Sequence, residues 1–173
     1  MLKLNKKKSY SFFVFLVIFL IFLKIDFRYK TDWTCCSDDF DYFSHAESLL
    51  IDFDFDYSNQ LYGFEGERYL YNGKNAPIGF FGTGLLSSPF LFLGNLLDNL
   101  INSSEKPFNY KILIYSFASL FALFTTYLYL IKSSKLLNVS VNKNLILLFL
   151  LGSGLSYYSF ERYSMTHTFD ALT

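Results

Sequence analysis

The sequence predicts an all-α polytopic membrane protein with three transmembrane helices and one large external loop. Three observations lead to this prediction. Hydrophobic residues make up 52% of the chain and aromatic residues 21%, against 17% charged residues. The apolar residues fall into long uncharged runs instead of short amphipathic ones. Lys and Arg are also separated from Asp and Glu along the chain, which is typical of loops that alternate between two sides of a membrane.

The predicted spans are three apolar runs, which are uncharged except for Lys24 and Lys111 near their ends. Residues 10–25 follow a basic N-terminus at 1–9, and because this run lacks the small-residue cleavage site of a secretory signal, an uncleaved anchor is favoured. Residues 111–131 and 144–160 are the second and third spans, each near the ~20 residues that a bilayer-crossing helix needs. Residues 132–143 carry lysines and no acid, so we expect them in the cytoplasm together with the N-terminus.

The remaining segments, 26–110 and 161–173, are predicted to lie outside. All 15 Asp and Glu residues fall within them. The first segment is expected to hold interfacial helices at about 38–51 and 76–100. The uncharged part of the second helix, 76–97, is long enough to span, but an added span would place the lysine-rich loop outside. Its Gly and Pro residues also interrupt a helix, which favours an interfacial or re-entrant helix pair.

A dense acidic stretch, residues 37–56, opens the predicted external loop. Helical spacing separates a polar face from an apolar one. The polar face consists of Asp38, Asp41, Tyr42 and His45, and the apolar face of Phe40, Phe43, Ala46 and Leu50. Acids then alternate with aromatic residues over 52–57, which predicts an extended segment with one wet face. These patterns predict a helix that holds carboxylates above an apolar boundary.

Short motifs occur in a fixed order along the chain. They are Asp38, Tyr42-Phe43, Ser48-Leu49, Asp52-Phe53-Asp54, Asn59-Gln60-Leu61-Tyr62, Lys74-Asn75-Ala76-Pro77-Ile78-Gly79 and Met165-Thr166-His167. This order, with its topological placement, resembles the N-terminal part of bacterial GT-C glycosyltransferases, which include protein mannosyltransferases and aminoarabinose transferases. Asp39 stands where a glycine is common in that family, and Gln60 where a Glu is common.

The resemblance implies a transferase at the bacterial inner membrane. A sugar would move from a polyprenyl-phosphate donor to a hydroxyl of a lipid, glycan or protein acceptor on the non-cytoplasmic face. Asp38 would be the general base, with Asp39 as the alternative because of the missing glycine. Asp38 would instead serve as a simple helix cap if it accepts the free N–H groups of the helix. Enzymes of this family continue through many further helices, so we expect the 173-residue chain to be truncated and inactive alone.

The remaining candidate residues would contact the substrate. The resemblance assigns this role to Tyr42, Asp52, Asp54, Lys74, Arg162 and His167. Lys74 and Arg162 are the cations best placed for a phosphate, because a guanidinium binds such groups bidentately, although either would equally anchor a helix end. No cofactor is expected, and a divalent cation remains an alternative. A calcium loop at 52–63 is disfavoured because Tyr57 and Gly63 stand where Gly and Glu are needed.

Two other classes are a nucleic-acid-binding protein and a non-enzymatic membrane protein. Nothing in the basic residues resembles a nucleic-acid-binding patch, because nearly half of them flank predicted cytoplasmic helix ends. A small non-enzymatic integral membrane protein stays as the alternative to an enzyme. Its acidic external loop would bind cations or a partner.

Overall fold

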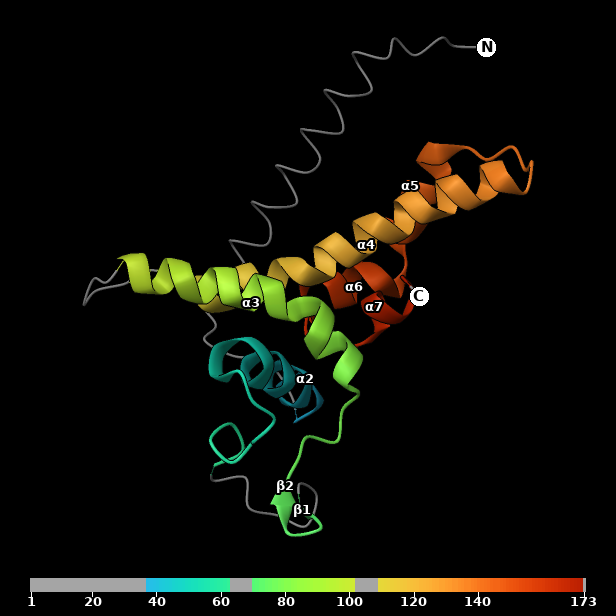
Figure 1. Cartoon of the computed structure of the whole chain (residues 1–173). Helices are drawn as coiled ribbons and strands as arrows, with labels where there is room; N and C mark the ends of the chain where they lie inside the picture. Colours follow the sequence, from blue (N-terminus) through green and yellow to red (C-terminus); the bar gives the residue numbers. More distant parts are fainter. Residues whose placement is uncertain (1–36, 63–69, 102–108, 173) are drawn as a thin grey trace.

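A computed structural model of the chain describes residues 37–62, 70–101 and 109–172. The described part is mostly helical, as the sequence predicts (Figure 1). Its elements are α2 (Ser37–Glu47), the π-helix η1 (Ser48–Asp52), β1 (Leu70–Tyr71), β2 (Lys74–Asn75), α3 (Phe81–Ile101), α4 (Tyr110–Leu136), α5 (Lys143–Gly152), α6 (Gly154–Phe160) and α7 (His167–Asp170). The predicted first span, 10–25, lies outside the described residues.

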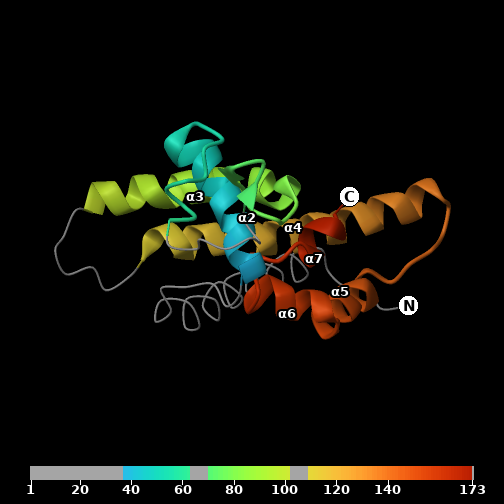
Figure 2. The same cartoon turned by 90° about the horizontal axis from the view of Figure 1, so that it is seen from below.

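Helices α3 and α4 form a long hairpin. They lie side by side in both Figure 1 and Figure 2. Both are long and apolar enough to cross a membrane. The predicted second span, 111–131, falls within α4. The predicted helix pair at 76–97 is wrong, because α3 is one continuous helix with Pro89 inside it. Its ribbon bends in its N-terminal part, as a proline that lacks an N–H donor makes a helix do (Figure 1).

The two sides of α3 differ in residue size. Its buried side holds mainly small residues, namely Thr83, Gly84, Ser87, Ser88, Leu91 and Gly94. Its exposed side holds Leu85, Leu86, Leu93, Leu96, Leu97 and Leu100. At 3.6 residues per turn the two sets occupy opposite faces. Glycine, which was expected to interrupt this helix, therefore acts here together with serine as a packing position that lets neighbouring helices approach.

The predicted third span, 144–160, is interrupted. Helix α5 ends at Gly152 and α6 begins at Gly154, with Ser153 extended between them at φ −91° and ψ 169°. The Ser153 hydroxyl donates to the carbonyl of Leu150 and accepts from the amide of Leu155, which satisfies backbone groups at the break. Two short helices therefore replace the single predicted helix.

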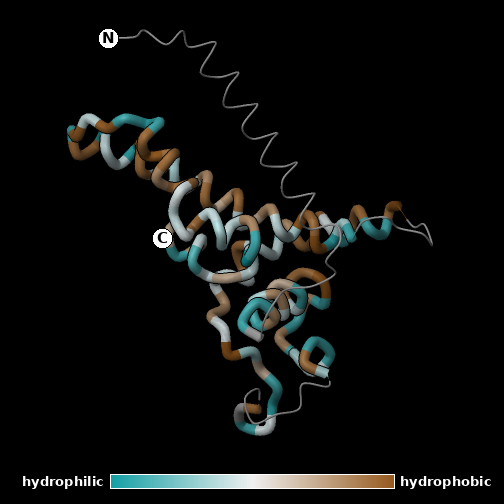
Figure 3. Tube along the Cα trace, turned by 180° about the vertical axis from the view of Figure 1, so that it is seen from behind, coloured by the Kyte–Doolittle hydropathy of each residue, from teal (hydrophilic) through white to brown (hydrophobic). Residues whose placement is uncertain are grey.

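The core lies where α2 packs against α3 and α4. Its buried members are Phe43, Ala46, Leu91, Ile112, Tyr115 and Tyr163. A Cβ atom added at Gly84 would collide with the Cβ of His45 on α2. Figure 3 shows mostly hydrophobic colouring along α3 and α4 and more hydrophilic colouring in α2 and the loops beneath it. The β1–β2 hairpin pairs Leu70 with Asn75 and extends away from this core (Figure 1).

The predicted polar face of α2 is mostly buried, which corrects the amphipathic interpretation. Asp41 and His45 are 1% and 7% exposed, and Tyr42 is buried as well, whereas Asp38 is exposed. The reason is that α3 covers one side of α2 and the segment after α6 covers another. The alternating segment 52–57 is also not extended. The π-helix η1 ends at Asp52, and the next residue, Phe53, has a φ of 59° that turns the chain.

Gly94 and Gly82 provide a matched test of the α3–α4 contact. A Cβ at Gly94 would lie 2.8 Å from the Cα and carbonyl oxygen of Lys111, which are backbone atoms, whereas Gly82 has open space. We expect Gly94→Ala to lower the free energy of unfolding in detergent by about 1–3 kcal/mol. Gly82→Ala should leave it unchanged or raise it by up to about 1 kcal/mol. Equal effects at the two positions would contradict the close approach.

Candidate functional site

The candidate site forms where α2 meets the segment that follows α6. Asp39, in the first turn of α2, is 2% exposed and accepts from the Nε of Arg162 at 3.1 Å. The Ser164 hydroxyl donates to the backbone carbonyl of Asp39 at 2.9 Å. The hydroxyl of Tyr115 on α4 lies 2.8 Å from that of Ser164. Since the single hydroxyl proton of Ser164 goes to Asp39, Tyr115 is the donor in this pair. The two predicted external segments are thus joined across 123 residues.

Asp38 has surroundings different from those of its neighbour. It is exposed, and its charge acts on Tyr42, one turn further along α2. Burial raises the pKa of the Tyr42 hydroxyl above its ordinary value of 10.0, and a hydrogen bond with Thr166 opposes that rise. The charges of Asp38 and Asp170 raise it further. Tyr42 is therefore a neutral phenol at physiological pH, next to an exposed carboxylate.

His167 belongs to the same region. It begins α7 and is exposed, and its ring centroid lies 4.1 Å from that of Tyr158 on α6. Arg162 contacts Asp39 and Thr166 contacts Tyr42, so the described fold brings two of the predicted and motif residues beside α2, and His167 follows them in the same short segment. Ser164 and Tyr115 belong to the site but were not predicted from the sequence. Their only signal was the presence of polar side chains in or next to an apolar run.

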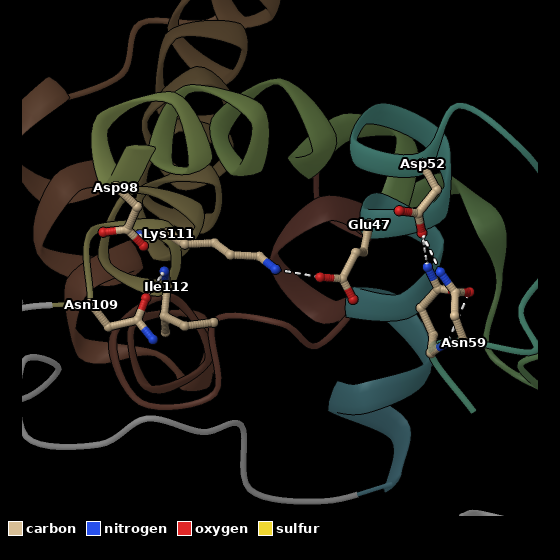
Figure 4. Close-up of polar contacts among 8 residues, drawn as sticks. Glu47, Asp52, Asn59, Asp98, Asn109, Lys111 and Ile112 are labelled. Atoms are coloured by element: carbon tan, nitrogen blue, oxygen red, sulfur yellow. Dashed lines mark hydrogen bonds and ion pairs between the residues drawn. The ribbon is translucent and has the colours of Figure 1, made fainter. Parts of the chain in front are cut away.

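A second ion pair fixes the other end of α2. Glu47 pairs with Lys111 at the start of α4, and the Lys111 ammonium also lies 5.4 Å from the centre of the Phe43 ring. Asp98, in the last turn of α3, accepts from the backbone N–H groups of Tyr110 and Lys111 at the start of α4. The side chain of Asn109 caps the N-terminus of α4 (Figure 4). The C-terminal end of α2 and the start of α4 are thereby held together.

Asp52 and Asp54 lie in a turn outside this junction. Asp52 accepts from the side chains of Asn59 and Gln60 (Figure 4). Asp54 accepts from the Ser48 hydroxyl at 3.2 Å. Their carboxylates thus serve the local turn, an arrangement that a side chain preceding a tight turn often adopts.

Lys74 is also separate from Arg162. It lies on β2, and its charge helps to lower the pKa of Asp56, after two hydrogen bonds from Ser58. Figure 1 places the β1–β2 hairpin apart from α6 and α7. The fold therefore does not bring Lys74 together with Arg162. Among the residues that the structure describes, no three His, Cys, Asp or Glu side chains converge as a metal site would require.

His45 is a buried connector between three segments. Its Nε2 lies 2.9 Å from the carbonyl oxygen of Gly79, which only accepts, so Nε2 carries the proton. Its Nδ1 then accepts from the Tyr57 hydroxyl at 2.9 Å. The rings of Tyr57 and Phe81 meet the imidazole edge to face. Burial lowers the pKa of His45 below its ordinary 6.5, against the opposing influence of Gly79 and the Asp41 charge.

No protein-family model matches this chain, and neither does a characterised protein or a solved structure. The resemblance to GT-C enzymes therefore rests on the motifs and their order.

The Asp39–Arg162 pair yields a stability prediction. Arg162→Gln removes the cation from a buried carboxylate, so we expect it to lower the free energy of unfolding by about 3 kcal/mol. Adding Asp39→Asn should recover part of that loss, because the buried charge is then gone. Lys74→Gln, an exposed control, should change stability by less than about 0.5 kcal/mol. Denaturant unfolding in detergent measures the wild type, Arg162→Gln, Asp39→Asn alone, the double variant and Lys74→Gln. Strictly additive losses for the pair would refute the coupling.

A second stability prediction concerns pH and His45. The unfolded histidine binds a proton near pH 6.5, whereas the folded one does so only at lower pH, so the unfolded state binds more protons in between. Stability should therefore fall as the pH is lowered from about 7 to about 5. His45→Gln should flatten this part of the profile of unfolding midpoint against pH. His167→Gln, at an exposed position, should retain it, and a profile unchanged by His45→Gln would exclude the assignment.

Proposed function

We propose that this chain is the N-terminal catalytic part of a membrane glycosyltransferase of the GT-C type. It would transfer a sugar from a polyprenyl-phosphate donor to an acceptor hydroxyl at the outer face of a bacterial inner membrane. The supporting observation is the Asp39–Arg162 contact. It brings the two segments that carry the motifs together and leaves Asp38 exposed near Tyr42, whose hydroxyl is hydrogen-bonded to Thr166.

The difference in exposure favours Asp38 over Asp39 as the general base. A base must come within hydrogen-bond reach of the acceptor hydroxyl. Asp39 is buried and its charge is balanced by Arg162, which suits a residue that positions the site. Asp38 is exposed one residue earlier, at the same end of α2. Arg162 and His167 would then lie on the side where the donor phosphate departs, since a guanidinium binds phosphate oxygens well.

The proposed topology has the N-terminus in the cytoplasm and α4 crossing the bilayer. Residues 132–143 then lie in the cytoplasm, which agrees with the preference of lysines for the cytoplasmic ends of spanning helices. The interrupted pair α5 and α6 would lead back toward the outer face. Backbone broken in this way is tolerated at membrane depth only where protein or water surrounds it.

In this topology α3 does not cross to the cytoplasmic side, and it lies against the outer part of α4, where Gly94 approaches Lys111 and the ring of Phe90 meets that of Phe121. Helix α2 packs against the first half of α3, with Gly84 touching His45 and Gly79 touching Tyr42. If α3 crossed the bilayer, the four carboxylates of α2 would be carried to membrane depth, where ionised groups are costly. An α3 at the interface leaves them near water. Its leucine face would then rest on the outer leaflet.

The test of this function is the Asp38→Asn substitution, assayed in membranes that contain the full-length product of the gene. Asp38 is exposed in the first turn of α2 and Asn is close to Asp in size, so the variant should insert and fold. Loss of a general base lowers a rate by roughly 10² to 10⁴, so transfer from a lipid-linked donor should fall by at least about a hundredfold. Asp54→Asn, an exposed acid in the turn, is the control and should retain activity. Full activity of Asp38→Asn, with normal protein levels, would reject this assignment.

A further inference from the structure

A cluster of exposed apolar side chains lies beside the N-terminal end of α3. Phe53, Phe55, Ile78 and Phe80 are 72%, 68%, 56% and 82% exposed. We call these four residues the aromatic rim. They come from two segments that His45 joins, through Tyr57 on one side and the Gly79 carbonyl on the other. The Phe55 ring also lies 5.9 Å from that of Phe81, the first residue of α3. The rim is therefore continuous with the beginning of this helix.

The backbone at Phe53 is held in a conformation that its side chain disfavours. Three non-glycine residues in the described part of the chain have positive φ, and two of them, Asn72 and Asn138, are of a type that tolerates it. Phe53 is the third, with a φ of 59°. In this conformation the Cβ crowds the next carbonyl oxygen. Glycine or asparagine would end η1 at lower cost, yet a phenylalanine stands here with its ring in solvent.

The acids that alternate with Phe53 and Phe55 have hydrogen-bond partners within their own loop. Ser48 donates to both the carbonyl and the carboxylate of Asp54, and the amide of Asp56 donates to that carboxylate as well. Asp56 in turn accepts from Ser58. Both carboxylates thus accept hydrogen bonds from donors in their own loop. In the D-F-D-F-D-Y pattern, Asp54 and Asp56 therefore accept hydrogen bonds within the loop while remaining exposed, and the two phenylalanine rings are exposed beside them.

We infer that the aromatic rim inserts into the boundary between headgroups and acyl chains of the outer leaflet. This inference rests on the membrane location proposed above for α3 and α4. Its occupant is the bilayer, because the exposed apolar surface runs on without a charge from Ile78 into the leucines at the start of α3. When aromatic and aliphatic side chains at the end of an interfacial helix leave water for the membrane interface, the free energy of the system falls. The rim would fix how deep the acidic end of α2 sits, and hence the height of Asp38 above the lipid.

The test uses single spin labels in the full chain, reconstituted in neutral phosphatidylcholine vesicles. Cys35 and Cys36 are first replaced by serine. Labels then replace Phe53, Phe55 or Phe80, and a matched label replaces Ser58, an exposed polar residue of the same loop. Collision with oxygen, which concentrates in lipid, is compared with collision with a water-soluble nickel chelate. The oxygen-to-nickel ratio should be several-fold higher at the three rim positions than at Ser58. Equal ratios at the four positions would overturn the inference.

A label at Phe121, exposed in the middle of α4, separates this inference from the proposed membrane location. A lipid-like ratio at Phe121 with water-like ratios at the rim would leave the span intact and overturn the rim. Such a result would point to a sugar or a protein as the occupant. A water-like ratio at Phe121 would overturn both proposals.

A pair of variants tests whether the rim acts as a unit. With the label at position 55, Phe53→Ser combined with Phe80→Ser should lower the oxygen-to-nickel ratio several-fold. Leu70→Ser is the control, because Leu70 is similarly exposed at 57% but lies on the β1–β2 hairpin. A ratio that does not respond to the double change, or that responds equally to Leu70→Ser, would contradict insertion by the rim.

Discussion

The buried ion pair between Asp39 and Arg162 is the contact on which the arrangement of the site depends. Asp39 lies beneath the exposed end of α2, and a carboxylate there is costly unless a cation and hydrogen bonds offset its loss of water. Arg162 provides the cation, and Ser164 holds the backbone at the same residue. Once this contact forms, the direction of α2 is set, and Asp38 and Tyr42 take their places beside Thr166. Glu47 and Lys111 fix the opposite end of the helix.

The mostly helical class and the position of α4 could be predicted from the sequence, because they follow from local composition. The uncharged run at 112–131 is long enough for a single spanning helix by its composition alone. The burial of α2 could not be predicted in this way. Its polar face is covered by α3 and by residues that lie more than a hundred positions further along the chain, and helical periodicity describes only the helix itself.

For the candidate site, the sequence identified residues but not how they are paired. Asp39 and Arg162 were both candidates, yet nothing in their local sequence indicates that they touch. Lys74 and Arg162 were treated as equivalent cations, whereas the fold separates them. The two errors at 76–97 and 144–160 have a common cause, since the effect of a glycine in a helix depends on its neighbours. Gly84 and Gly94 allow close packing, but Gly152 and Gly154 flank a break with open space around them.

The long sequence separation of the Asp39–Arg162 pair has a consequence for biogenesis. Chains are synthesised at roughly 5–20 residues per second, so Arg162 leaves the ribosome on the order of ten seconds after Asp39. During that interval α2 has no guanidinium to meet its buried carboxylate, and its first turn must stay hydrated. The amino-terminal half of the chain therefore waits for the carboxy-terminal half before its acidic helix can dock. A factor that shields nascent chains would have access to this helix throughout that interval.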